Sequence, residues 1–306
     1  MTFFSRLQSK QHHQSHGKYL RNFLYLTNFH LTCWRTVHTC PADTPGEHNH
    51  ADFYELVVVT GGSARHRLQN QYQRISPGSV LLIKPGLFHE YTEYRNLEIY
   101  NLLFGEEFLR YFLPDLTQLE GFQLIFNTLP KGKVLRNEEE GLRIQEDHFT
   151  EITKVLESMD ELKSSQEPGT QTMLLSEFIR VFLLLAKYCQ WTGLPRRGQH
   201  LPQLTGLLAT LDRELSAEWS LEKMARRVAM SVSSFRQEFH RLTGQSPLAY
   251  LQRRRLDLGK EMLATHPTLS LQEIASRCGF HDMNYFSRQF LKYHGIRPTA
   301  YRKGQG

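Results

Sequence analysis

The chain of 306 residues has few cysteines and no long hydrophobic run. Its cysteines are Cys33, Cys40, Cys189 and Cys278. No two of them form a CxxC pair, so the sequence predicts neither a disulfide framework nor a zinc finger, and we expect reduced, mostly buried thiols. The most apolar run, residues 173–185, contains Glu177 and Arg180 and is too short to span a bilayer. The N-terminus shows no signal-peptide core. These absences favour a cytoplasmic protein without a membrane partner.

The excess of positive over negative charge lies in one part of the chain. The composition, 40% hydrophobic and 22% charged, is that of a folded protein, and the length favours about two domains. Residues 198–306 contain 16 Lys and Arg against 9 Asp and Glu, whereas residues 1–197 contain 21 against 22. The net excess of +6 therefore lies in the C-terminal third, which indicates a polyanionic partner for that part alone.

Composition and periodicity divide the chain into four segments. We predict a flexible arm over residues 1–18, a β-rich domain with helices over 19–190, a linker over 191–203, and an all-helical domain over 204–306. The arm is polar and rich in Gln and His, and the linker carries Gly, Pro and charge without a period. The predicted fold class is α+β.

The first large segment begins with short strands. Residues 19–130 look β-rich: strands are expected over 55–60, ending at Gly61 and Gly62, over 79–83 and over 97–104. Turns are expected at Pro77-Gly78 and Pro85-Gly86. Short strands at this spacing favour a sandwich or small barrel.

Two helices follow the strands. The first carries one apolar stripe, formed by Ile152, Val155, Leu156 and Met159. The second, over residues 171–190, is apolar on more than one side and must be covered by the domain core or by a second subunit. We predict that this region forms a homodimer.

The C-terminal segment contains an internal repeat. Residues 224–227 parallel 274–277 at an offset of 50. At an offset of 51, Phe235, Phe239, Gly244, Pro247 and Tyr250 parallel Phe286, Phe290, Gly295, Pro298 and Tyr301. The second copy therefore has one extra residue in its turn.

Each copy follows the pattern of a helix-turn-helix unit. Ala225 and Ala275 suit a close helix crossing, and Ala229 and Gly279 fall at the tight turn four residues later. Ser231 and Asp282 are predicted to cap the next helix. A helix over residues 248–263 joins the units, and two recognition helices about one duplex turn apart can enter successive major grooves. A plain helical bundle would explain the aromatic residues but not the repeat and the basic excess together.

The repeat resembles the DNA-binding domain of the AraC/XylS family. The carrying residues are Ile274-Ala275, Cys278-Gly279-Phe280, residues 285–290, Gly295, Pro298 and Tyr301-Arg302. Gly259 departs from the resemblance, because that family has Ala in the connecting helix, and it is expected to cost about 1 kcal/mol of helix stability.

Helix geometry selects the side chains that face DNA. With the two phenylalanines of each second helix turned inward, the outward residues near the helix start are Ser233, Arg236, Gln237, Met283, Asn284, Ser287 and Arg288. The resemblance implies base contacts at the same positions. Arg236 and Arg288 suit guanine, and Asn284 or Gln237 suits adenine, although phosphate contact alone is the alternative for each Arg. Arg253, Arg254, Lys292, Arg302 and Lys303 are expected to contact phosphates or water.

An acidic residue suggests a further partner. We expect Glu273, on the first helix of the second unit, to project away from DNA, where it could meet RNA polymerase. A solvated helix charge is the simpler explanation.

The N-terminal domain contains a second cluster of polar residues. His48-Asn49-His50, Glu55 and His89 resemble in their spacing the cupin barrel, and in metal-bearing cupins three such His and the Glu bind one divalent ion. Three alternatives stay open: a metal site, a polar pocket for a small effector, or a structural pair of His50 with Glu55. We favour the effector pocket and predict no bound metal and no cofactor.

The residues around this cluster resemble those of the rhamnose-operon regulators. The resemblance rests on residues 47–50 and 53–57 and implies a sugar effector such as L-rhamnose. A site for a sugar needs several polar groups and an apolar surface for the face of the sugar ring. Four residues could help supply these: Tyr54, His66, Tyr91 and Tyr100. The predicted effector-binding residues are His48, His50, Tyr54, Glu55, His66, His89 and Tyr91.

The sequence thus predicts a DNA-binding transcription regulator, an activator controlled by a small effector, and not an enzyme. The alternative is a metal-dependent cupin enzyme fused to a DNA-binding tail. It is disfavoured because no separate catalytic acid or base is evident. A nonspecific architectural DNA protein would not need a fused sensor domain.

Overall fold

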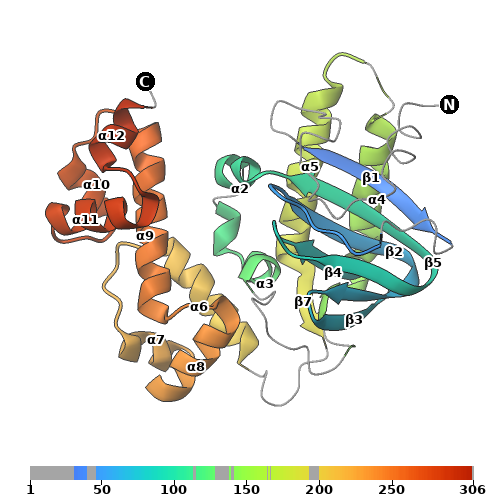
Figure 1. Cartoon of the computed structure of the whole chain (residues 1–306), viewed down its shortest axis with the longest axis horizontal. Helices are drawn as coiled ribbons and strands as arrows, with labels where there is room; N and C mark the ends of the chain where they lie inside the picture. The colour runs from blue at the N-terminus through green and yellow to red at the C-terminus, as the bar shows by residue number, and fades with distance from the viewer. Residues whose placement is uncertain are drawn as a thin grey trace. The chain divides into compact units, whose positions relative to one another are not determined.

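The computed structural model describes residues 31–39, 46–112, 115–127, 138, 141–163, 165, 167–192 and 200–304. The chain forms two compact units (Figure 1), here called the barrel unit, Met1–Gln199, and the DNA-binding unit, His200–Gly306. The predicted arm over 1–18 and Cys40 lie outside the described residues.

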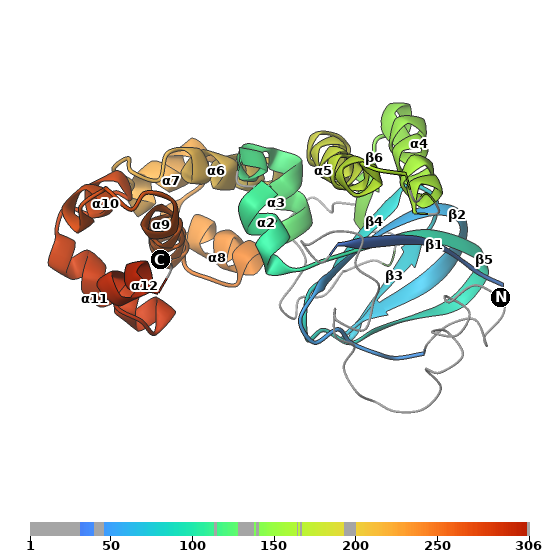
Figure 2. The same ribbon diagram turned by 90° about the horizontal axis from the view of Figure 1, so that it is seen from above.

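The barrel unit is built on an antiparallel sheet. Its strands are β1 (Thr32–His38), β2 (Tyr54–Leu68), β3 (Gln71–Ile75), β4 (Ser79–Ile83), β5 (His89–Phe104), β6 (Gly141–Ile144) and β7 (Cys189–Thr192). Neighbours follow the order β1-β5-β2-β4-β6-β7, and β3 also pairs with β2. The strands curve around an interior (Figure 2). Alternate side chains of the strands form an apolar cluster there. These include Val57, Val59, Leu81, Leu97 and Ile99. The expected barrel-like architecture is confirmed.

The paired glycines after the first predicted strand do not end it. β2 continues through Gly61 and Gly62, and its pairing with β5 shifts register between Val59 and Arg65. Gly62 has a φ of +65°, and a Cβ there would lie 2.0 Å from the carbonyl oxygen of Asn96. The glycines therefore form bulges that bend a long strand, and the expected strand end is wrong.

Helices interrupt the segment expected to be β-rich. After β5 come α2 (Glu106–Phe112), the 3-10 helix η3 (Asp115–Gln118) and α3 (Glu120–Asn127). The expectation of strands up to residue 130 is wrong here. These elements were missed because Phe108 and Phe126 pack in aromatic contacts with Phe182, and Phe122 stacks on Phe126, so tertiary burial, not helical periodicity, dominates the pattern.

The two predicted helices are present. α4 (Glu146–Leu162) and α5 (Thr170–Tyr188) lie side by side on one side of the sheet (Figure 2). The four residues of the predicted apolar stripe of α4 are its buried ones. α5 buries Phe178, Phe182 and other apolar side chains, whereas Met173 is 54% exposed. The domain core therefore covers most of the second helix.

The linker is shorter than predicted. Residues 191–192 belong to β7, which pairs with β6, and helix α6 begins at Leu201. Pro202 does not prevent α6, because it occupies the first turn of that helix, where no backbone N–H is needed. Residues 193–199 lie outside the described part of the chain.

The DNA-binding unit is helical over its described residues. Its helices are α6 (Leu201–Arg213), α7 (Leu221–Arg227), α8 (Val232–Thr243), α9 (Pro247–Thr265), α10 (Leu271–Arg277), α11 (Met283–His294) and α12 (Pro298–Lys303). The first helices of the two copies, α7 and α10, are offset by 50 residues, and the second helices, α8 and α11, by 51. The predicted repeat and the extra turn residue are confirmed.

Caps fix where each second helix begins and ends. The Ser231 hydroxyl accepts a hydrogen bond from the Ser234 N–H, and the Asp282 carboxylate accepts one from the Tyr285 N–H. Gly244 and Gly295 end the helices in the left-handed conformation, both with a φ of 72°. The predicted caps are therefore confirmed in both copies.

Gly259 has a packing reason that the sequence concealed. A Cβ at this position would lie 2.8 Å from the ring of Phe286, which is fully buried in the core of the second copy. Glycine lowers the stability of α9 as a helix, but it lets α9 and α11 pack closely. Alanine at position 259 would obstruct this packing.

The described residues include no helix that is long and apolar enough to cross a membrane. Cys33, Cys189 and Cys278 are free and buried, as expected, and burial raises the pKa of the Cys33 and Cys278 thiols to about 12.

Candidate DNA-binding surface and effector site

The second helix of each copy presents a polar surface. Phe235 and Phe239 of α8, like Phe286 and Phe290 of α11, are fully buried. The remaining residues near the helix starts face outward: Ser233, Arg236, Gln237, Asn284 and Arg288 are exposed, and Met283 and Ser287 are half-buried. The inward aromatic residues thus orient these predicted contacts.

The two surfaces carry different residues at equivalent positions. With the offset of 51, Ser233 corresponds to Asn284, Arg236 to Ser287, and Gln237 to Arg288. Because each side chain type prefers a different base edge, two helices with these residues would select different base sequences.

Arg254, which the sequence assigned to a phosphate contact or to solvent, instead forms an ion pair between two helices of the DNA-binding unit. The Arg254 Nε donates to the Asp212 carboxylate at 2.7 Å, and Asp212 is buried. Burial disfavours the charged guanidinium, but the attraction of Asp212 and other neighbours gives Arg254 a net rise in pKa. Arg255 donates to the carbonyls of Leu215 and Ala217, both at 2.8 Å. Arg254 therefore ties α9 to α6, and the expectation of a phosphate contact is wrong for it.

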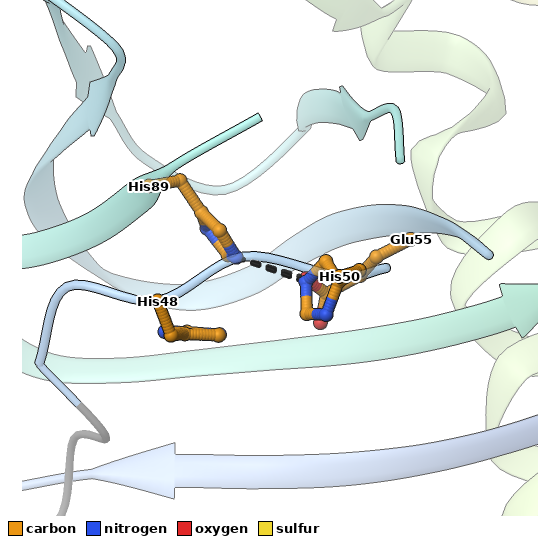
Figure 3. A group of neighbouring side chains, drawn as sticks. All are labelled: His48, His50, Glu55 and His89. Carbon is orange, nitrogen blue, oxygen red and sulfur yellow. Dashed lines mark hydrogen bonds and ion pairs between the residues drawn. The ribbon is translucent and has the colours of Figure 1, made fainter. Parts of the chain in front are cut away.

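In the barrel unit, the four residues of the cupin-like pattern converge. His48 and His50 lie in the segment before β2, Glu55 in β2, and His89 at the start of β5 (Figure 3). Backbone hydrogen bonds between His48 and His89 join the first of these segments to β5. One potential ligand atom from each residue lies within 4.8 Å of all the others.

The cluster is tightly packed. The Nε2 atom of His50 lies 2.7 Å from Oε2 of Glu55 and 3.0 Å from Nε2 of His89, which lies 3.4 Å from the same carboxylate oxygen. His50, Glu55 and His89 are buried, and His48 is half-buried. The contact of His50 with Glu55 that the structural alternative predicts is present.

Burial and the neighbouring side chains both shift pKa values in this cluster. It lowers the pKa of His66 to about 4 and that of His89 well below its ordinary value. Burial also acts to raise the pKa of Glu55, but the charge and hydrogen bond of His50, with help from His89 and His48, bring it below its ordinary value. Burial thus favours the neutral imidazole form of His66 and His89, whereas the neighbouring histidines favour the carboxylate form of Glu55.

Two further predicted residues join the cluster. His66 Nε2 lies 3.4 Å from His89 Nδ1, and the rings of His66 and Tyr91 are 5.0 Å apart. Both residues are buried. The Tyr91 hydroxyl is buried and has no hydrogen-bond partner among the described residues.

Tyr54 and Tyr100 do not belong to the histidine cluster. Successive strand residues point to opposite faces, so Tyr54 points away from the face of Glu55, and its ring stacks on Phe104. Tyr100 alternates with Ile99, which fills the interior, and burial and Asp160 of α4 raise its pKa to about 12. The expected placement of these two residues in the effector site is wrong.

Asn101 and His38 belong to the site but were not predicted. With the Asn101 amide oriented to satisfy both neighbours, its nitrogen donates to Glu55 Oε1 at 3.1 Å and its oxygen accepts from Trp34 Nε1 at 3.0 Å. His38 is buried and stacks on Tyr91. A signal for Asn101 existed, because a polar residue between apolar Ile99 and Leu103 alternates with the interior positions of its strand.

A separate recess opens on the barrel unit. It has a volume of about 550 Å³ and is lined by Ser63, Ala64, Arg74, Ile75, Ser76, Glu93, Tyr94 and Arg95. None of the residues of the histidine cluster lines it.

Both parts of the chain are similar to known proteins. Residues 224–304 match the family model of a helix-turn-helix domain, and residues 40–175 match that of the AraC-like ligand binding domain. The HTH-type transcriptional activator RhaR of Mannheimia succiniciproducens is 28% identical, and the match covers 83% of this chain and 86% of that protein. The HTH-type transcriptional activator RhaS of an Enterobacter species is also 28% identical, with 85% and 88% covered. The DNA-binding domain of AdpA, solved with a target DNA, is 31% identical, with 33% and 91% covered and a TM-score of 0.33.

The protein is therefore a DNA-binding transcription regulator with a fused ligand-binding domain. Its ligand-binding domain is AraC-like, and its C-terminal domain is a helix-turn-helix domain of the AraC type.

Proposed function

We propose that the protein is a cytoplasmic, dimeric transcription activator that a small sugar controls, with a deoxy sugar such as L-rhamnose as the first candidate. The observation that carries this proposal is the repeat of two capped helices with exposed polar starts, fused to a barrel with a polar interior. The names of the similar RhaR and RhaS activators support the activating role.

The repeat indicates how DNA would be read. Two recognition helices held by one connecting helix can enter successive major grooves on one face of the duplex. Because α8 and α11 differ at all three equivalent positions described above, the two half-sites would differ in sequence.

The barrel unit would bind the effector. Its interior offers the histidine cluster and the Tyr91 hydroxyl, which has no partner within the described parts of the chain, and the separate recess offers further polar groups. Effector binding would favour one of two arrangements of the DNA-binding units within a dimer. On α5, Met173 is exposed and Leu175 and Ile179 are half-buried, which supports this helix as part of the dimer contact.

The test measures the affinity of the full-length protein for the DNA upstream of its own gene, with and without a panel of sugars. One sugar is expected to change the dissociation constant by about 5- to 150-fold, the usual range for coupled sites. A specific complex that no sugar alters would contradict effector control while leaving the DNA-binding function intact.

RNA polymerase is a further proposed partner, and Glu273 permits a test. Its carboxylate accepts a hydrogen bond from the Ser270 N–H at 2.8 Å, and its own backbone N–H donates to the Ser270 hydroxyl at 3.2 Å, which forms a capping box at the start of α10. Glu273→Ala is expected to cost about 0.5–1 kcal/mol of stability through this lost cap. If the residue also contacts polymerase, transcription at saturating DNA occupancy will fall; unchanged transcription would assign Glu273 to capping alone.

The alternative function, a metal-dependent cupin enzyme fused to a DNA-binding tail, gains no support from the relatives named above, which are transcription regulators by name.

A further inference from the structure

The two copies of the repeat have separate apolar cores that share one helix. In the first half of α9, Tyr250 and Leu251 pack with residues of α6, α7 and α8. In its second half, Leu256 and Leu263 pack with residues of α10 and α11. Figure 1 shows α9 running from the helices of the first copy to those of the second. Residues 252–255 therefore lie at the boundary between the two cores.

A shared helix alone would hold the two copies loosely. At about 1.5 Å per residue, α9 is long enough to curve, and Gly259 in its second half lowers its stability as a helix. A bend or a change of twist in α9 would move the recognition helices α8 and α11 relative to each other. Because half-sites on DNA have a fixed spacing, accurate binding to both of them needs a second contact between the copies.

Arg255 forms this second contact. Its Nε donates to the Leu215 carbonyl and its Nη2 donates to the Ala217 carbonyl, both at 2.8 Å, so it holds the loop between α6 and α7. The same guanidinium lies against the turn of the second copy, because a Cβ on Gly279 would lie 2.9 Å from Arg255 Cζ. That Cβ would also lie 2.8 Å from the Leu215 oxygen, so the loop and the turn are neighbours. These four residues are here called the junction: Leu215, Ala217, Arg255 and Gly279.

The surroundings of Arg255 favour positioning over charge pairing. Within the described residues it forms no ion pair, whereas Arg254 beside it pairs with Asp212 at 2.7 Å. Burial lowers the pKa of Arg255, because the charged form loses contact with water. Arg255 donates to two carbonyls through a rigid planar fork, which fixes the position of the loop on α9. If Arg255 only joined α9 to α6, it would duplicate the ion pair of Arg254.

The two turns of the repeat differ where the junction lies. The turn of the first copy covers residues 228–231 and contains Ala229, which is exposed. The turn of the second copy covers residues 278–282, one residue more, and contains Gly279 next to the loop between α6 and α7. Both residues have a left-handed backbone, with φ values of 53° and 80°. The second turn thus has glycine where the loop leaves no room for a side chain.

We propose that Arg255 is a positioning residue for DNA binding, because it sets the spacing of the two half-sites that α8 and α11 accept. It does so by holding the loop before the first copy next to the turn of the second copy, while its own helix belongs to both cores. This inference rests on the proposed binding of two half-sites and adds the residue that determines their spacing. The competing outcome of the test is that Arg255 stabilises the fold alone.

The test measures the affinity of the full-length protein for a set of duplexes that carry both half-sites selected from random DNA. In two of them, one base pair is added or removed between the half-sites, which shifts one half-site by about 3.4 Å and turns it by about 35°. In a reference duplex, one half-site is replaced. Relative to this reference, the parent is expected to bind the correctly spaced pair about 100-fold more tightly and to lose most of that gain at the other two spacings.

Arg255→Met keeps the length of the side chain but removes the donors to both carbonyls. Its gain over the reference duplex should fall to roughly 10-fold and should differ by less than about 3-fold among the three spacings. Its affinity for the reference duplex should stay close to that of the parent. A lower fraction of folded protein would reduce binding to every duplex in the same proportion, so these ratios separate positioning from stability.

Two further variants complete the test. The matched control is Arg213→Met, because Arg213 at the end of α6 is exposed and pairs with Glu214 on the surface, and its loss should leave the spacing preference of the parent. Arg255→Lys serves if Arg255→Met fails to fold. It keeps the charge but lacks the planar fork, so the spacing preference should again weaken.

The outcomes separate this inference from the proposed function. A spacing preference like that of the parent in the folded Arg255 variants would overturn the positioning role alone and assign Arg255 to stability. A parent protein that binds one half-site as tightly as both would remove the proposed binding of two half-sites, and the positioning role with it.

Discussion

Gly279→Ala is expected to destabilise the DNA-binding unit by about 3 kcal/mol. Gly279 has a φ of +80°, where a side chain costs about 1–2 kcal/mol. Its added Cβ would lie 2.8 Å from the Leu215 carbonyl oxygen and 2.9 Å from Cζ of Arg255, two groups that form a hydrogen bond with each other. Disturbing this partly buried hydrogen bond, which involves a charged group, adds about 1–3 kcal/mol. The melting temperature of the unit should fall by roughly 10–20 °C, as measured by calorimetry on the full chain.

The first copy of the repeat supplies a matched control. Ala229 occupies the equivalent turn with a φ of 53° and is exposed. Ala229→Gly removes the strain of a side chain in the left-handed conformation. Glycine also gives the unfolded chain more backbone freedom, which opposes folding by a smaller amount. The variant should therefore stabilise the unit by about 0.5–1 kcal/mol. A Gly279→Ala variant as stable as the parent, or an Ala229→Gly variant less stable than it, would contradict this account of the turns.

Arg236→Ala and Arg288→Ala are expected to weaken DNA binding by about 1–3 kcal/mol each, roughly 5- to 150-fold, and to relax base selection in different half-sites. The two arginines lie on α8 and α11 at positions that do not correspond in the repeat, so each would read its own base pair. Competition binding against DNA with single base changes measures both effects.

Arg241→Ala is the control on the same helix. Arg241 lies five residues beyond Arg236, about 140° around the helix, and its Nε donates to Glu238 at 2.7 Å. Its loss should change affinity little and leave base selection unaltered. If both Arg236→Ala and Arg288→Ala weakened binding equally for all sequences, the arginines would be phosphate contacts and the assignment of base contacts would fail.

The DNA-binding unit was largely predictable because its signals are local. The glycines that end the second helices, the residues that cap their starts and the inward phenylalanines recur at a fixed offset, so one copy confirms the other. Arg254 was misassigned because its partner, Asp212, lies in a helix far along the sequence, and no local pattern shows that contact.

The barrel unit was predicted less completely because its contacts are between distant strands. His48, His50, Glu55, His66, His89 and Tyr91 were predicted for the site. Asn101 and His38 were missed, because only the pairing of β5 with β1 and β2 brings them to the cluster. The alternation of β2 would have excluded Tyr54 from that face. The long strand through Gly61 and Gly62 was missed because paired glycines signal a turn as readily as a bulge.

Selection of binding sites from random duplex DNA by the full-length protein tests the central claim most directly. We predict enrichment of two half-sites of different sequence, about 10–10.5 base pairs apart and protected on one face of the duplex, for each protein subunit. Recovery of DNA without a shared sequence, or of a single half-site whose recognition needs only one of α8 and α11, would contradict a double helix-turn-helix reader.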